Sequence, residues 1–244
     1  MYVLKAHNLR KCYGGRPVVD GVSFDVAEGE IVGLLGRNGA GKTTSFRMVV
    51  GMIKPEDGSI LFNGADVTRL PMYRRAQRGM GYLAQEPSIF QRLSVEQNLQ
   101  AILETRPLRK AQRKEKAAGL MEQFGLTKLA RQQARTLSGG ERRKLEIARS
   151  LITEPTLILL DEPFSGVDPV AVEDLQREIT QLREAGIAVL VTDHNVERTL
   201  EICHRAYVMI DGQVFCEGSP RDIIKDEQVC KLYLGSTFRG DEFG

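Results

Sequence analysis

Residue types that handle phosphate chemistry occur in three short stretches of this chain. The loop Gly36 to Thr43 has the pattern G-x-x-x-x-G-K-T, in which backbone N–H groups curl around phosphate and a lysine adds charge. An apolar run, Leu157 to Leu160, is followed by Asp161 and Glu162, carboxylates suited to holding Mg²⁺ and activating water. The glycine-rich pentapeptide Leu137 to Glu141 lies between these two stretches in the chain. Their order predicts that the chain binds and hydrolyses a nucleoside triphosphate.

The loop is expected to make most of the contacts to the nucleotide. Lys42 supplies a point charge to the outer phosphates, Thr43 offers a hydroxyl to Mg²⁺, and Thr44 has a secondary phosphate role. A helix opening at Lys42 adds the positive end of its dipole. The residues of this stretch expected to bind ATP are Arg37, Asn38, Gly39, Ala40, Gly41, Lys42, Thr43 and Thr44.

The acidic pair is expected to divide two tasks between neighbouring residues. Asp161 is placed to hold Mg²⁺, directly or through water. Glu162 can face the γ-phosphate and polarise the attacking water. Whether Glu162 takes the proton completely is left open by the residue pattern.

Further candidates lie outside these stretches, each with a structural alternative. His194 follows an apolar strand and is interpreted as a contact to the γ-phosphate, although an isolated histidine is more often structural. Gln85 could reach Mg²⁺ or the attacking water, and could report the nucleotide state to the segment after it. Tyr13, beside Gly14 and Gly15, could stack on adenine or simply pack.

The elements that must position these residues follow from the apolar patterns. Short strands fill the first 65 residues, a helical segment rich in basic residues follows Pro71, and strands alternate with helices after Gly139. This alternation predicts an α/β fold with a mostly parallel sheet. The predicted strands are Val3–Leu9, Val18–Val26, Ile31–Leu35, Ser59–Phe62, Met80–Leu83, Leu157–Leu160, Ile187–Val191, Ala206–Ile210 and Gln213–Cys216; the predicted helices are Lys42–Val50, Val95–Leu103, Lys110–Phe124, Glu141–Ile152, Val170–Glu184 and Pro220–Lys225.

The composition limits the classes of partner. Lys and Arg total 34 against 32 Asp and Glu, a net charge of +2, so no basic excess indicates a nucleic-acid binder. The basic run Arg106 to Lys116 is interpreted as a solvated helix face, with an anionic partner as the alternative. No apolar run approaches the roughly 20 residues that span a bilayer. The 4 cysteines show no metal-ligand spacing, which predicts reduced thiols in the cytoplasm.

Taken together, these motifs resemble those of ABC-transporter nucleotide-binding subunits over nearly the whole chain. Leu137 to Glu141 is similar to the family signature, Gln85 to the Q-loop glutamine, and Ser165 to Asp168 to the D-loop. The resemblance implies a P-loop NTPase core with an N-terminal antiparallel β portion and an inserted α-helical subdomain. It also implies one ATP-binding domain over residues 1–244, with 1–84 and 155–244 as the α/β core and 85–154 as the helical subdomain.

The resemblance further implies a head-to-tail homodimer that encloses ATP and Mg²⁺. Each ATP would contact the P-loop of one copy and Ser138 and Gly140 of the other, and Asp168 would lie at the same interface. Closure on ATP and opening after hydrolysis would then move the partners of the dimer.

Within the family, the Q-loop region Tyr82 to Val95 and the tail Tyr233-Leu234-Gly235 with Phe238 are similar to the ATPases of lipopolysaccharide export. This similarity implies integral membrane permease subunits that contact the chain near Phe90 and Arg92, and a peripheral location on the cytoplasmic face of the inner membrane. The alternatives are the ATPase of a branched-chain amino-acid importer and a soluble ABC ATPase without a transport role.

Overall fold

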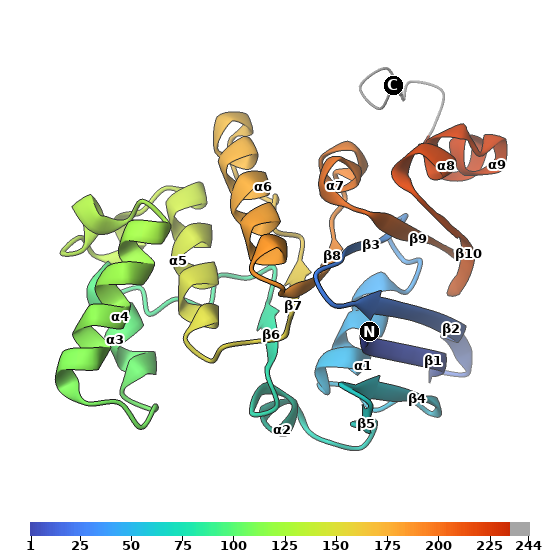
Figure 1. Ribbon diagram of the computed structural model, residues 1–244. Coiled ribbons are helices and arrows are strands. Elements are labelled where there is room, and N and C mark those ends of the chain that lie inside the picture. Colours follow the sequence, from blue (N-terminus) through green and yellow to red (C-terminus); the bar gives the residue numbers. More distant parts are fainter. Residues whose placement is uncertain (235–244) are drawn as a thin grey trace.

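The computed structural model describes residues 1–234, which form two β-sheets with helices packed between and around them (Figure 1). The larger sheet has the strand order β10-β9-β3-β8-β7-β6, and the smaller sheet has the order β2-β1-β4-β5. The strands are β1 (Tyr2–Tyr13), β2 (Arg16–Ala27), β3 (Ile31–Gly36), β4 (Asp57–Phe62), β5 (Ala65–Asp66), β6 (Met80–Leu83), β7 (Leu157–Asp161), β8 (Ala188–Thr192), β9 (Arg205–Ile210) and β10 (Gln213–Gly218).

The central strands of the larger sheet are parallel and buried on both faces. β3 pairs in parallel with β8 and β9, and β7 pairs in parallel with β6 and β8. Alternate side chains serve two cores: Ile158 and Leu160 of β7 join one apolar cluster, whereas Leu157 and Leu159 join the other. A continuous apolar run is therefore required here, because neither face of the strand meets water.

The smaller sheet is antiparallel and covers α1 (Lys42–Val50) on the side away from the larger sheet. Phe46 and Val49 of α1 share a core with Leu4 of β1 and Leu34 of β3. Figure 1 shows this helix between the blue strands and the parallel sheet. The helix that carries Lys42 is thus held on both sides.

The helical part of the chain lies to one side of the parallel sheet (Figure 1). Leu99 and Leu145 of this part share an apolar core with Ile158 and Leu160 of β7, so the two regions are packed together. The helices here are α3 (Val95–Leu103), α4 (Lys110–Gln123) and α5 (Gly139–Leu151), with short 3₁₀ turns at Thr127–Leu129 and Ala134–Thr136; the short helix α2 (Met72–Ala76) lies apart from them, next to β6 (Figure 1).

The C-terminal region adds the outer helices and the antiparallel edge strand β10. Its helices are α6 (Pro169–Glu184), α7 (Val196–Ile202), α8 (Pro220–Lys225), α9 (Glu227–Val229) and a π-helical turn at Cys230–Leu234. No helix of residues 1–234 is long and apolar enough to cross a membrane. Gly235 and Phe238, which the tail comparison used, lie outside the described residues.

The predicted α/β class, with a mostly parallel sheet and an N-terminal antiparallel portion, is confirmed. One boundary was wrong for a clear reason. α5 begins at Gly139 rather than Glu141, because Ser138 caps it: its side chain accepts a hydrogen bond from the Glu141 N–H, and the Glu141 carboxylate accepts one from the Ser138 N–H. The short elements β5, α2 and α7 were missed.

Candidate active site

The parallel strands bring the separate motifs to one edge of the sheet. β3 leads into the loop Gly36 to Thr43, β7 ends at Asp161, and β8 leads into His194, while β6 leads into Gln85. Because these strands are parallel, their carboxyl ends all meet at the same edge, where α/β folds bind ligands.

The loop is enclosed by its neighbours so closely that glycine is required. Gly41 has a left-handed backbone with φ of 96°, and a Cβ there would lie 2.5 Å from the carbonyl oxygen of Val18. A Cβ on Gly36 would collide with the carbonyl oxygen of Met209. The glycines therefore let the loop pass between β2 and β9 before α1 begins.

Lys42 is buried inside the loop, with a relative exposure of 9%. Its Nζ donates hydrogen bonds to the carbonyl oxygens of Gly36 at 2.6 Å and Arg37 at 3.1 Å. Burial lowers the pKa of Lys42, and the nearby carboxylates, Glu162 first, oppose that change. The ammonium is thus positioned next to the acidic strand ends.

Several of the other loop residues are more accessible than Lys42. Arg37, Asn38, Gly39 and Thr43 are exposed, Thr44 is half-buried, and Ala40 is buried. The hydroxyl-bearing Thr43 stands in the first turn of α1, where an anion is favoured by the unpaired N–H groups.

Asp161 and Glu162 occupy different environments although they are adjacent. Asp161 is 5% exposed and its Oδ2 accepts a hydrogen bond of 3.3 Å from the Tyr82 hydroxyl. Burial raises the pKa of Asp161, and the Tyr82 hydrogen bond opposes this. Glu162 has a left-handed backbone, φ 48°, and its N–H donates to the Thr192 carbonyl at 2.7 Å. Such a conformation is uncommon for a non-glycine residue, and it turns Glu162 away from the line of the strand.

Gln85 and His194 meet at the Glu162 carboxylate. The Gln85 Nε2 donates to Glu162 Oε2 at 2.8 Å, and His194 Nδ1 lies 3.4 Å from the same oxygen. The His194 side chain is 59% exposed, whereas that of Glu162 is 22% exposed. Residues from two other segments therefore meet at one carboxylate oxygen of Glu162.

Asp193 belongs to this group and was missed from the sequence. It is fully buried; Oδ2 accepts from the Phe164 N–H, and Oδ1 accepts from the Asn195 N–H, both at 2.9 Å. Oδ1 also lies 3.3 Å from His194 Nδ1. Burial raises the pKa of Asp193, and its hydrogen bonds oppose the shift. An acid directly after a buried strand, as at Asp161, was the signal available in the sequence.

The signature glycines pack within the chain. A Cβ on Gly139 would lie 2.6 Å from the Gly166 carbonyl oxygen, and one on Gly140 would lie 2.8 Å from the Ala171 Cβ. Gly140 is buried, whereas Ser138 is exposed at the start of α5. The Ser138 oxygen accepts the capping bond described above, which leaves its own O–H free to donate. The family resemblance implies a nucleotide contact for Gly140; the structure adds packing of Gly139 against the segment before α6 and of Gly140 against α6 itself.

Two predicted nucleotide contacts stand apart from the acidic pair. Asp168 is exposed and caps α6, its Oδ1 accepting from the Ala171 N–H at 3.1 Å. Tyr13 is 49% exposed at the β1–β2 turn, and Lys11 Nζ lies 5.5 Å from the centre of its ring. Among residues 1–234, no hydrogen bond or ion pair joins either side chain to the loop Gly36 to Thr43.

A cavity of about 260 Å³ lies between the acidic pair and the start of α5. Gln85 and Glu162 line it on one side, and Gly139, Arg143 and Glu146 line it on the other. Arg143 and Glu146 were not foreseen, since charged residues on a helix usually face water. They form an ion pair of 2.9 Å whose side chains are 7% and 3% exposed.

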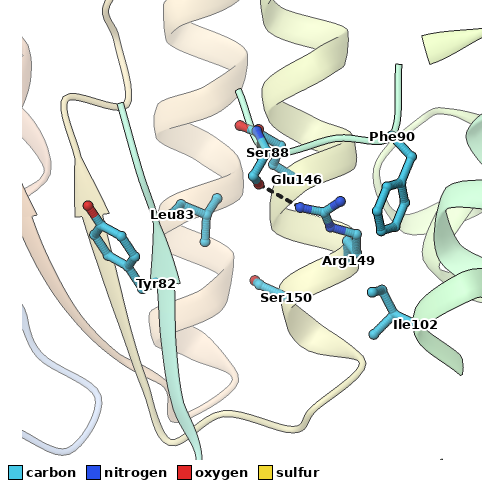
Figure 2. Close-up of a pocket in the computed structure, with 8 residues that line it drawn as sticks. All are labelled: Tyr82, Leu83, Ser88, Phe90, Ile102, Glu146, Arg149 and Ser150. Atoms are coloured by element: carbon cyan, nitrogen blue, oxygen red, sulfur yellow. Dashed lines mark hydrogen bonds between the residues drawn. The ribbon is translucent and has the colours of Figure 1, made fainter. Parts of the chain in front are cut away.

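A second cavity, of about 230 Å³, opens further along the same face of α5 (Figure 2). Figure 2 shows Arg149 between Ser88 and the ring of Phe90, with a hydrogen bond of 2.5 Å from Arg149 Nη2 to Ser88 Oγ. The Phe90 ring is 45% exposed, and Arg92 is exposed on the same loop. Asn98 is fully buried and holds this loop: its Oδ1 accepts from the Phe90 N–H at 2.8 Å, and its Nδ2 donates to the Phe90 carbonyl at 3.1 Å.

Comparisons with known proteins assign the chain to a family. A family model described as ABC transporter matches residues 19–165. The lipopolysaccharide export system ATP-binding proteins LptB of Haemophilus influenzae and Escherichia coli K12 are each 52% identical over 240 residues, 98% of this chain and 100% of the relative. A probable ABC transporter ATP-binding protein of Azorhizobium caulinodans is 53% identical over 237 residues, 97% of this chain and 84% of the relative.

Solved structures agree with the fold. The ADP conformation of MJ1267, an ATP-binding cassette of an ABC transporter, matches with a TM-score of 0.87 at 29% identity. The match covers 96% of this chain and 99% of the MJ1267 chain. Dimeric MJ0796, a bacterial ABC transporter cassette, matches with a TM-score of 0.79 at 24% identity, over 89% of this chain and 99% of the MJ0796 chain. At this identity the match supports the fold alone.

Proposed function

The chain belongs to the family of ABC transporter ATP-binding subunits, and from this premise we propose that it hydrolyses ATP to power membrane subunits that export lipopolysaccharide. The observation that carries the hydrolytic part is the meeting of Gln85 and His194 at one oxygen of Glu162. The acidic pair lies close enough to Lys42 to influence the pKa of its ammonium, so phosphate-binding and water-activating groups share one site.

The loop and Lys42 bind the phosphates in this proposal. An ammonium has three donors, so Lys42 can take a phosphate oxygen as a partner while it keeps a carbonyl of the loop. The helix α1 begins at Lys42 and directs its N-terminal N–H groups to the same place. Arg37, Asn38, Gly39, Ala40, Gly41, Thr43 and Thr44 complete the phosphate contacts.

The residues present fit a magnesium ion. The carboxylate of Asp161 is buried and, among residues 1–234, has only the Tyr82 hydroxyl as a side-chain hydrogen-bond partner, and Thr43 presents a hydroxyl at the start of α1. These are hard oxygen donors of the kind Mg²⁺ prefers, and Gln85 supplies an amide oxygen nearby. When bound, Mg²⁺ neutralises charge on the phosphates; Thr43, Asp161 and Gln85 would hold it.

Glu162 polarises the attacking water and accepts its proton. Gln85 holds one carboxylate oxygen by a hydrogen bond of 2.8 Å, which fixes the direction of the carboxylate. His194, oriented by buried Asp193, contacts the γ-phosphate from the exposed side. The left-handed backbone at Glu162 allows this residue to face outward while Asp161 stays buried.

The active unit in this proposal is a head-to-tail homodimer. Ser138, whose O–H is free to donate, and the adjacent Gly140 segment approach the nucleotide held by the partner copy, and Asp168 lies at the same interface. Tyr13, exposed at a turn next to the sheet, stacks on adenine. A self-complementary interface of this kind needs only copies of one chain.

Membrane subunits are proposed to dock at the second cavity, on the loop that carries Phe90 and Arg92. Phe90 is a large exposed apolar side chain on a loop fixed by a buried asparagine, which gives a partner a rigid surface. This places the helical subdomain, proposed as residues 85–154 between core segments 1–84 and 155–244, next to the inner membrane on its cytoplasmic face. The relatives named for lipopolysaccharide export favour that cargo over the branched-chain amino-acid alternative.

A replacement experiment tests this function. The chain is expressed in Escherichia coli cells depleted of their own lipopolysaccharide export ATP-binding protein, and newly made lipopolysaccharide at the cell surface is measured. The chain should restore surface lipopolysaccharide, and Glu162→Gln at equal abundance should not. Recovery of ATPase activity and membrane association without surface lipopolysaccharide would contradict the assigned cargo.

A further inference from the structure

Glu146 lies between the two cavities, which follow one another along a single face of α5. It is the residue that lines both the cavity facing Glu162 and the cavity beneath Phe90. Its side chain is 3% exposed, so the carboxylate is used inside the protein and not as a surface charge.

On the docking side, Glu146 holds the loop that presents Phe90. Its Oε1 accepts from the Ser88 N–H at 2.6 Å and from the Ser88 hydroxyl at 3.4 Å. The same hydroxyl accepts from Arg149, whose guanidinium lies 5.4 Å from the centre of the Phe90 ring. Figure 2 shows Glu146, Ser88, Arg149 and Phe90 following one another across this cavity.

On the catalytic side, Glu146 holds Arg143, which reaches two backbone positions. Arg143 Nη1 donates to the Ala84 carbonyl at 3.0 Å, and Nη2 donates to the Asp161 carbonyl at 3.4 Å. Ala84 immediately precedes Gln85, and Asp161 immediately precedes Glu162. The Arg143 guanidinium therefore holds the backbone next to each member of the hydrogen-bonded pair Gln85–Glu162.

From this continuous path we propose that Glu146 is a positioning residue that couples the catalytic pair Gln85–Glu162 to the docking loop Ser88–Phe90. The inference rests on the proposed function, because it assigns a route by which nucleotide at one site changes the loop at the other. When Gln85 or Glu162 shifts, the neighbouring backbone carbonyls that are hydrogen-bonded to Arg143 move with it. The buried Arg143–Glu146 ion pair then transmits the movement to the Ser88 amide. A buried pair transmits such a shift because separating its charges leaves each without a partner.

The test measures hydrogen exchange of the Ser88 to Phe90 amides with and without Mg·ATP, in full-length protein carrying Glu162→Gln to prevent turnover. In this parent, Mg·ATP should change the Ser88 exchange rate by at least about fivefold, the lower end of the usual range of coupling between sites. Adding Glu146→Gln leaves one acceptor oxygen for two donors, so Ser88 and Arg143 cannot both be held. The change should then fall below about twofold, while affinity for Mg·ATP stays that of the parent.

Glu178→Gln is the matched control. Glu178 is also a largely buried carboxylate with a basic partner on α5, Lys144 at 3.8 Å, but it contacts neither cavity. This variant should keep the full response to Mg·ATP. A merely structural role of Glu146 would lower the melting temperature and leave the nucleotide-dependent response in place.

The outcomes separate the two proposals. If Glu146→Gln binds Mg·ATP and retains the full response, the coupling inference is wrong and the proposed function stands. If the parent binds no Mg·ATP, the proposed function fails. Should Glu146→Gln not fold, Arg143→Lys decides, because it keeps a charged partner for Glu146 but cannot hold the Ala84 and Asp161 carbonyls together; an unchanged response at the Ser88 amide would overturn the inference.

Discussion

Gly139→Ala should destabilise the protein, although alanine is the better helix former. The added Cβ would lie 2.6 Å from the Gly166 carbonyl oxygen, about 0.8 Å short of ordinary contact at 3.4 Å. Both groups belong to backbone segments that are held, one by the Ser138 cap and the other by the start of α6. Overpacking of this kind costs about 1–3 kcal/mol. For a chain of this size it corresponds to a fall in melting temperature of about 2–12 °C.

Gly119→Ala is the control, with the opposite expected sign. Gly119 lies inside α4, is exposed, and has nothing within 4 Å of the position its Cβ would take. Alanine should therefore stabilise by about 0.5–1 kcal/mol through backbone entropy. The two variants are compared with the parent by urea denaturation and thermal unfolding in the same buffer.

Gly139→Ala should also reduce turnover. Moving the start of α5 away from Gly166 displaces Ser138, and misplacement by about 1 Å can cost about 10²-fold in rate. Equal stability of Gly139→Ala and the parent, with Gly119→Ala behaving as expected, would refute the close packing of α5 described above.

Other variants test separate parts of the account. Ser138→Arg should leave Mg·ATP binding to the monomer intact and abolish dimer closure and turnover, measured by fluorescent-nucleotide titration and size-exclusion chromatography; a dimer that still forms with Mg·ATP would contradict the role of Ser138. Lys42→Met keeps the length of the side chain but removes its charged donor, so nucleotide affinity should fall about ten- to a hundredfold, since a hydrogen bond from a charged group contributes about 1.5–3 kcal/mol. Asn98→Ala removes the carboxamide that pairs with the Phe90 N–H and carbonyl, and should cost about 1–3 kcal/mol of stability. Faster hydrogen exchange at the Phe90 amide would confirm that Asn98 holds this loop, and unchanged exchange would exclude that role.

The sequence was most informative where local chemistry determines local structure. The pattern from Gly36 to Thr43 predicted a strand, a loop and a helix because glycines, lysine and hydroxyl have fixed tasks there. The apolar run Leu157 to Leu160 predicted a buried strand because no polar residue interrupts it. The strands' parallel arrangement then brought Asp161 and His194 to one edge, as the alternation with helices implied.

The sequence was least informative where contacts join distant segments. Arg143 and Glu146 read as exposed helix charges, and only the folded chain brings Ala84 and Ser88 to them. The packing of Gly139 on Gly166 was likewise invisible, because the two glycines face each other from separate elements. Asp193 was recognisable in principle, since it is an acid directly after the buried strand β8, which neighbours β7 and its terminal Asp161.

Glu162→Gln tests the central claim that Glu162 activates water within a site closed by two copies of the chain. The variant keeps the shape of the side chain and the bond to Gln85 through its amide oxygen, and Glu173→Gln, which changes an exposed glutamate on α6, serves as the control. Steady-state ATP hydrolysis by Glu162→Gln should fall by about 10²–10⁴-fold, the usual contribution of a positioned base. With Mg·ATP, this variant should bind nucleotide as the wild type does and accumulate as a dimer. Hydrolysis at the wild-type rate, or a Glu162→Gln protein that binds Mg·ATP and remains monomeric, would contradict the account.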